Sequence, residues 1–181
     1  MDYEEGLIMD RPDTDKALHA LGLMVREAAG TDRALAMIAE ELCGGQYGRL
    51  LIAGESTSRV IKVCNELVDA HDDISKTLKS ALKVLTKESE SLFRVRHRYV
   101  HGSWAVDGTT SEPQLMLTKR FQAHPNFEKF SIAELHELAA KFNLMHDRLM
   151  DWLLQICSPG YQAGDLLKAR EEQLRNLRGG N

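Results

Sequence analysis

Residues 73–100 read DISKTLKSALKVLTKESESLFRVRHRYV, a stretch without glycine or proline. Its large aliphatic side chains recur at intervals of three, four and seven residues, which places them on one face of an α-helix. They are Ile74, Leu78, Leu82, Leu85 and Leu92. The stretch therefore predicts a long central helix, and Gly102 marks its end.

The same kind of apolar spacing occurs on both sides of the central helix. It predicts helices over residues 14–30, 31–45 and 56–71 before it and over residues 131–157 after it. Each of the four begins with Ser or Thr, and glycine ends the first two, as expected for helix caps. Residues 46–55 stay open between a short strand and a buried turn, because periodicity cannot classify so short a run.

The pattern changes after Gly102. Residues 103–121 contain two short extended runs around an Asp107-Gly108 turn and Pro113, which predicts a β-hairpin. The expected fold class is all-α: a helical bundle of about five to six helices with a β-hairpin inserted after the fourth helix. We expect a flexible acidic N-terminus over residues 1–13, one helical domain over 14–158 and a C-terminal helical tail over 159–181.

Composition narrows the class of protein. With 181 residues, 43% of them apolar, the chain suits one domain with a closed core. No segment approaches the roughly 20 continuous apolar residues of a membrane span, and no secretory signal is recognisable, so we expect a cytoplasmic protein. Cys43, Cys64 and Cys157 lie far apart without a CxxC pair, which predicts reduced core thiols and neither disulfides nor a zinc cluster.

Positive charge is concentrated on the central helix. Residues 74–101 hold seven Lys or Arg against two Glu, a local charge of +5, which leaves −9 for the rest of a chain whose net charge is −4. Most of these cations fall on one side of the helix, and such segregation suits a phosphate-bearing ligand. The candidate RNA contacts are Lys83, Lys87, Arg94 and Arg98. The alternative is an ordinary solvated helix face.

Arg96 departs from the pattern of the central helix. It falls in line with Leu85 and Leu92 on the apolar face, where an unpaired guanidinium costs several kcal/mol. Such an arginine needs a partner or a function. An internal carboxylate would satisfy it, or its stem would pack while its head reaches water. A third interpretation is a preorganised phosphate contact, because guanidinium stays charged and presents several donors in one plane.

His101 comes five residues after Arg96 and directly before Gly102. At the end of a helix its ring can be exposed, and the helix dipole favours a positive charge there. The position suits acid–base catalysis. An isolated histidine at a helix end is more often a cap or a surface residue. The catalytic assignment of His101 therefore depends on the nearby Arg96.

The order Arg96, His97-Arg98-Tyr99-Val100, His101 resembles the signature of the HEPN superfamily, an arginine with a polar residue directly after it and a histidine a few residues on. His97 fills the polar place. The following HGSWAVDGTTSEPQLML and SIAELHEL are similar to the hairpin and helix that follow this motif in bacterial HEPN-like proteins. The resemblance extends loosely over residues 14–157.

The resemblance implies a metal-independent endoribonuclease without cofactor, active as a homodimer in which Arg96 and His101 of both protomers line one RNA cleft. On a regular helix the two side chains point about 140° apart, so one copy surrounds a phosphate poorly. His101 would act on the 2′-hydroxyl or the leaving oxygen, with His97 orienting the site or sharing proton transfer. Tyr99 or Trp104 would stack a base, or pack in the core. The implied role is in a toxin–antitoxin or antiviral-defence system under control of a partner protein.

Other assignments are weaker. A non-catalytic HEPN-like dimerisation or RNA-binding module shares the fold and is the main alternative. His97 and His101 have a spacing that can chelate metal, but there is no HExxH glutamate and no obvious third ligand, so we expect no metal site. The HDD and HD pairs lack the further ligand clusters of a metal phosphohydrolase. The glycine turns lack the lysine of a phosphate loop.

Overall fold

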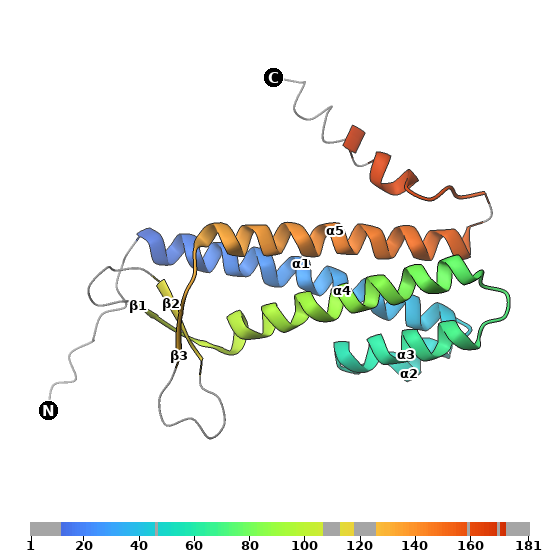
Figure 1. The fold of residues 1–181 in the computed structure, drawn as a ribbon, viewed down its shortest axis with the longest axis horizontal. Coiled ribbons are helices and arrows are strands. Elements are labelled where there is room, and N and C mark those ends of the chain that lie inside the picture. The colour runs from blue at the N-terminus through green and yellow to red at the C-terminus, as the bar shows by residue number, and fades with distance from the viewer. Residues whose placement is uncertain are drawn as a thin grey trace, which may run out of the picture.

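The protein is a bundle of long helices with a small sheet at one end (Figure 1). The computed structural model describes residues 12–45, 47–106, 113–117, 126–158, 160–169 and 171–172. The helices are α1 (Pro12–Leu42), α2 (Gly48–Ile52), α3 (Thr57–Ala70), α4 (Lys76–His101) and α5 (Ile132–Cys157). A further helical turn covers 165–169. The strands are β1 (Ser103–Val106), β2 (Pro113–Leu117) and β3 (Asn126–Lys129). The expected fold class, a helical bundle with a sheet after the fourth helix, is confirmed.

The prediction of two helices over 14–30 and 31–45 is wrong, because α1 continues through Gly30. Thr31 does not act as a cap: its buried hydroxyl donates to the Phe142 carbonyl of α5 at 2.8 Å. Gly30 lies against the His146 ring, 3.7 Å from where a Cβ would stand. Packing along α5 thus outweighs the roughly 1 kcal/mol that glycine costs a helix interior.

Residues 46–55, left open from the sequence, contain the short helix α2. It lies close against the end of α1, since a Cβ on Gly48 would stand 2.3 Å from the Glu40 carbonyl oxygen. Most of its large side chains face outward, and only Ile52 among them is buried. The exposed set is Tyr47, Leu50 and Leu51.

Helix α3 follows α1 in the same direction, and α4 then returns antiparallel to it. Thr57 at the start of α3 donates to Asp32 in the middle of α1 at 2.6 Å, and His71 at its end bonds the Leu42 carbonyl at 2.8 Å. Ser56 and Ser75 cap α3 and α4. Because α3 begins beside Asp32, it covers only one half of the bundle, as Figure 1 shows.

Helices α1 and α5 run parallel and side by side, with α4 antiparallel to both (Figure 1). Small residues on α1 allow the close approach to α5: Ala17, Ala20, Ala28 and Ala34 are all buried. A capping box at Ser131 and Glu134 begins α5, as the sequence predicted for Ser131. The Trp152 indole of α5 donates to the Leu78 carbonyl of α4 at 2.8 Å.

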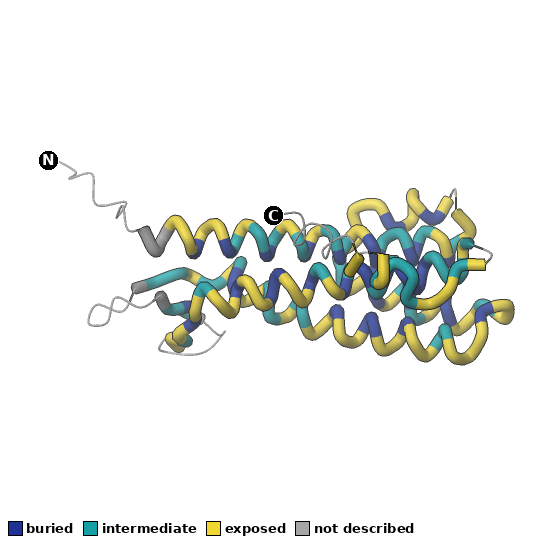
Figure 2. Tube along the Cα trace, turned by 90° about the horizontal axis from the view of Figure 1, so that it is seen from above, coloured by how far each residue is buried: buried dark blue, intermediate teal, exposed yellow. Residues whose placement is uncertain are grey.

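The core divides into two clusters along the bundle. One joins α1, α2, α3, α4 and α5 around residues such as Leu35, Leu82 and Trp152. The other joins the first half of α1, the end of α4, the start of α5 and the sheet around Met24 and Phe142. The buried positions form stripes on the facing sides of the helices (Figure 2). The sheet thus completes the core where α3 is absent.

The predicted hairpin is present and gains a third strand. β1 pairs with β2, and β2 with β3, all antiparallel. The Asp107-Gly108 turn lies outside the described residues, as do residues 1–11, which include most of the predicted acidic terminus. Leu115 of β2 is buried against Tyr99 and Phe130 in the second cluster.

The cysteines are free, and the prediction of three core thiols holds only for Cys64. Its side chain is buried, and burial raises the pKa of the thiol to about 12. Cys43 is half-buried and Cys157 is exposed. The prediction failed for Cys157 because this residue is the last of α5, at the end of the bundle where its side chain is exposed.

Replacing Phe142 with Ala tests the second core cluster. The ring is fully buried and meets Phe93 edge to face at 5.1 Å. We expect the free energy of unfolding to fall by about 3–5 kcal/mol. Leu144→Ala on the same helix is the matched control, because Leu144 is 53% exposed and its loss should change stability by less than about 0.5 kcal/mol. Urea denaturation measures both. Equal effects of the two substitutions would contradict this packing.

Candidate functional site

The candidate site lies at the C-terminal end of α4, where the helix passes into the sheet. Gly102 ends α4 and its N–H donates to the Arg98 carbonyl at 2.8 Å. A Cβ at this position would stand 2.6 Å from that carbonyl oxygen and 2.6 Å from Leu115 Cδ1. Glycine is therefore required by the close approach of β2, and this contact fixes the direction in which the chain leaves His101.

Arg96 lies on the core-facing side of α4, as the sequence predicted. The residue is half-buried, and its Nε is buried without a hydrogen-bond partner in the part of the chain that the structure describes. No internal carboxylate was found to pair with it there, which leaves two of the three interpretations. A buried donor without an acceptor costs about 1–3 kcal/mol, so an anion that reached this guanidinium would relieve a standing cost.

His97 and His101 lie side by side on the outer face of the same two turns. Both residues are exposed, and their ring centroids are 4.3 Å apart with the ring planes inclined by 44°. Within the described ranges, no protein group hydrogen-bonds to either ring. Arg96 and His101 are separated by about 140° around the helix, so the exposed imidazoles and the half-buried guanidinium face different directions.

Three of the four cations predicted to bind RNA form ion pairs with carboxylates. Arg98 forms an ion pair with Glu128 of β3 at 2.8 Å, Arg94 one with Glu90 at 3.6 Å and Lys83 one with Asp69 of α3 at 2.7 Å. Lys87 is exposed. The structure therefore brings carboxylates to much of the basic face, which weakens its positive field. These pairs are themselves exposed and contribute little to stability.

Tyr99 is buried and Trp104 is half-buried, and both pack in the second core cluster, the alternative that the sequence left open for each. Tyr99 is buried, packs edge to face on Phe130 at 5.5 Å and donates to Glu134 at 3.3 Å. Burial, and then the nearby Glu134 carboxylate, raise the pKa of Tyr99. Trp104 packs on Phe130 at 4.8 Å and donates to the Tyr99 carbonyl at 2.9 Å. Both rings are thus engaged in packing on Phe130.

Glu128 and Glu134 were not identified from the sequence as neighbours of the motif. Glu128 lies thirty positions after Arg98, and only the pairing of β3 with β2 brings it back to α4. Glu134 was recognisable as part of a helix cap, but nothing in the pattern indicated its bond to Tyr99. Both contacts depend on tertiary structure.

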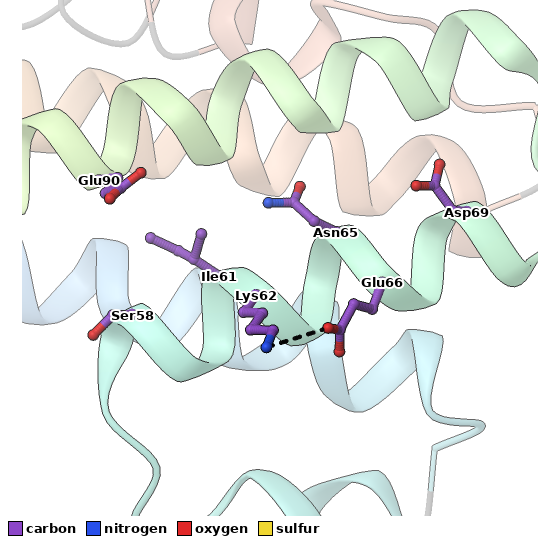
Figure 3. Close-up of a pocket in the computed structure, with 7 residues that line it drawn as sticks. All are labelled: Ser58, Ile61, Lys62, Asn65, Glu66, Asp69 and Glu90. Atoms are coloured by element: carbon purple, nitrogen blue, oxygen red, sulfur yellow. Dashed lines mark ion pairs between the residues drawn. The ribbon is translucent and has the colours of Figure 1, made fainter.

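A separate pocket opens between α3 and the middle of α4, with a volume of about 390 Å³ (Figure 3). Glu66, Asp69 and Glu90 line it, and its lysine, Lys62, is paired with Glu66 at 3.6 Å. Asp69 and Glu90 are paired as well, with Lys83 and Arg94, so the cations around this pocket already have carboxylate partners that a phosphate group would have to displace. It is distinct from the end of α4 that carries Arg96 and His101.

Two further features bear on the class of protein. Within the described ranges, no three His, Cys, Asp or Glu side chains gather where they could hold a metal ion. None of the described helices combines the length and apolarity needed to cross a bilayer.

Comparison of the chain with protein-family models, curated proteins and solved structures finds no match. The resemblance to the HEPN superfamily therefore depends on the short motif from Arg96 to His101 and on its place in the fold.

Replacing Gly102 with Ala tests the junction that positions His101. The added methyl group would meet a backbone oxygen and a fully buried leucine, so we expect a loss of about 1–3 kcal/mol of stability. Gly22→Ala in α1 is the control: Gly22 is exposed with no atom near its Cβ position, and alanine there should stabilise by about 0.5–1 kcal/mol. Thermal unfolding of both variants decides; a stabilising Gly102→Ala would contradict the packing.

Proposed function

We propose that this protein is a metal-independent endoribonuclease of the HEPN type, acting through Arg96 and His101. The observation that carries the proposal is the Arg96 guanidinium, whose Nε is buried without a partner among the described residues one helical turn and a half before an exposed histidine. A protein interior that keeps such a group has a cost of about 1–3 kcal/mol. Unfavourable local chemistry of this kind gathers at functional sites.

The chemistry assigned to the site needs no cofactor. An imidazole of the His pair removes the proton of the ribose 2′-hydroxyl, and the 2′-oxygen attacks the adjacent phosphorus. The bond to the 5′-oxygen breaks, and this oxygen takes a proton from an imidazole, leaving a 2′,3′-cyclic phosphate and a 5′-hydroxyl. Arg96 stabilises the charge that develops on the phosphoryl oxygens. His101 is the principal acid–base residue, and His97 orients it or shares the proton transfer.

A single chain provides this site incompletely, which is why we propose a homodimer. Arg96 and His101 point about 140° apart, so one phosphate would meet both groups only where two copies face each other. Helix α3 does not extend along this half of the bundle, since it begins beside Asp32. The first half of α1 leaves Leu18 55% exposed there. We place the second copy against this half of the bundle, where α3 is absent.

Lys83, Lys87, Arg94 and Arg98 would then contact the RNA backbone outside the reacting phosphate. Arg98, Arg94 and Lys83 would exchange their carboxylate partners for phosphates, which are bound with a strong dependence on salt. We further propose a cytoplasmic role in a toxin–antitoxin or antiviral-defence system, controlled by a protein partner.

The second candidate is a non-catalytic HEPN-like module for dimerisation or RNA binding. The ion pairs along the basic face favour the dimerisation role of such a module, because they lower the positive field that would attract RNA. The two candidates differ in whether RNA is cleaved. The buried Nε of Arg96, without a partner among the described residues, is the observation that favours cleavage.

Cleavage of labelled RNA in excess EDTA tests the proposal. We expect the wild type to cleave, Arg96→Ala to lose about 10²–10³-fold and His101→Ala about 10²–10⁴-fold in rate. Arg49→Ala on α2 and His136→Ala on α5 are matched controls, because both side chains are exposed and belong to neither the motif nor its ion pairs. RNA binding without cleavage by the wild type would favour the module, and equal traces in every variant would indicate a contaminant.

Arg96→Met separates function from stability. The substitution keeps the length of the stem and removes the unpaired Nε, so the free energy of unfolding should stay unchanged or rise by up to about 1–3 kcal/mol. Urea denaturation measures this in parallel with the cleavage assay. A variant that is both inactive and strongly destabilised would indicate a structural role for Arg96.

A composite site also makes activity depend on protein concentration. Over a roughly hundredfold dilution through the dissociation constant of the dimer, cleavage per chain should fall with the fraction of dimer. Sedimentation velocity under the same conditions provides that fraction. Constant cleavage per chain in samples that sediment as monomers would rule out a site shared between two copies.

A further inference from the structure

We propose that His97 and His101 form a binding site for a divalent transition-metal ion such as Zn²⁺ or Ni²⁺, and that the bound ion blocks the acid–base function of His101. The first half depends only on the geometry at the end of α4. The second half rests on the proposed nuclease function. The site would be inhibitory, which is compatible with cleavage that needs no metal.

The geometry fits chelation by two imidazoles. The histidines are four residues apart, one above the other on the helix, which is the spacing that provides two ligands in zinc-binding helices. Their ring centroids lie 4.3 Å apart with the planes inclined by 44°. Zn²⁺ binds imidazole nitrogen at about 2.0–2.1 Å, and both side chains are exposed, so their rings are free to turn one nitrogen each toward a shared ion.

The two rings are also available, unlike other histidines of the bundle. His71 uses both ring nitrogens, one on the Leu42 carbonyl at 2.8 Å and one on Asp73 at 3.1 Å, and these bonds raise its pKa. His146 bonds Asp147 at 3.2 Å. No group in the described residues makes such a bond to His97 or His101, so an ion would displace only water from them.

The arginines near His97 and His101 repel a metal ion less strongly than the sequence suggests. Arg94 and Arg98 flank the histidines, but each is paired with a carboxylate, Glu90 at 3.6 Å and Glu128 at 2.8 Å. Arg96 points toward the core side of the helix. The repulsion that three free arginines would exert is therefore partly offset by two carboxylates within ion-pair distance.

The coordination defines the class of ion and the strength of binding. Imidazole selects Zn²⁺, Ni²⁺ or Cu²⁺ over Mg²⁺, which prefers oxygen ligands. No third protein ligand gathers with the pair among the described residues, so water completes the sphere and the ion exchanges readily. An ion on an imidazole nitrogen occupies the lone pair that would accept the 2′-hydroxyl proton. Zn²⁺ should therefore inhibit cleavage, and EDTA should restore it.

Isothermal titration calorimetry with ZnCl₂ tests the site on tag-free protein. The Cys157→Ser background removes the exposed thiol that would compete for the metal. We expect binding that weakens by at least about tenfold in His97→Ala and in His101→Ala, since each removes one of the two ligands. His136→Ala is the matched control, an exposed histidine on α5 that should bind as the parent does. MgCl₂ should give no signal at the pair.

The outcomes separate this proposal from the nuclease proposal. Unchanged Zn²⁺ affinity in both His97→Ala and His101→Ala, or an equal loss in His136→Ala, overturns the metal site whether or not the protein cleaves RNA. Zn²⁺ binding at the pair with cleavage unaffected at saturation overturns the inhibitory half. If the protein binds Zn²⁺ at the pair but shows no nuclease activity, the metal site is supported and only the proposed nuclease function is contradicted. Lower pH should weaken the binding, because protons compete for the same nitrogens.

Discussion

The parallel packing of α1 against α5 is the constraint on which the rest of the structure depends. Alanines on α1 bring the two helices close, and the Thr31 hydroxyl joins the middle of α1 to the Phe142 carbonyl at 2.8 Å. Both helices run nearly the whole length of the bundle (Figure 1). Helices α2, α3 and α4 and strand β2 add residues to the core around this pair, and two separate core clusters form because different elements cover its two halves.

The short length of α3 explains where the candidate site lies. Since α3 begins beside Asp32, five helices including the short α2 close one half of the bundle, whereas three helices and the sheet close the other. The last turns of α4 belong to the second half. There the sheet covers Tyr99 through Leu115 and Phe130, while His97 and His101 remain exposed. The fold thus leaves one end of a basic helix accessible and packs that end closely against β2 at Gly102.

Arg96 and the neighbouring arginines differ in how well the protein itself satisfies their charge and hydrogen-bond donors. The buried Nε of Arg96 makes the site a local cost to stability that an anion would relieve. The carboxylates of Glu128 and Glu90 instead satisfy the neighbouring arginines when no ligand is present. An anion at Arg96 would meet a guanidinium without a carboxylate partner among the described residues, whereas Arg94 and Arg98 would first have to leave theirs. This ranking of the three arginines gives Arg96 the strongest claim to a function.

The sequence by itself determined the helical class, the boundaries of α3 and α5, the end of α4, the hairpin after α4 and the core-facing position of Arg96. These features depend on local periodicity and capping, which neighbouring residues carry. Only tertiary structure decided the rest. Gly30 continues α1 because α5 packs against it, and the third strand brings Glu128 to Arg98 across thirty positions. The burial of Tyr99, the packing of Trp104 on Phe130 and the exposure of His97 and His101 likewise follow from which element covers each face of α4. A linear pattern does not contain that information.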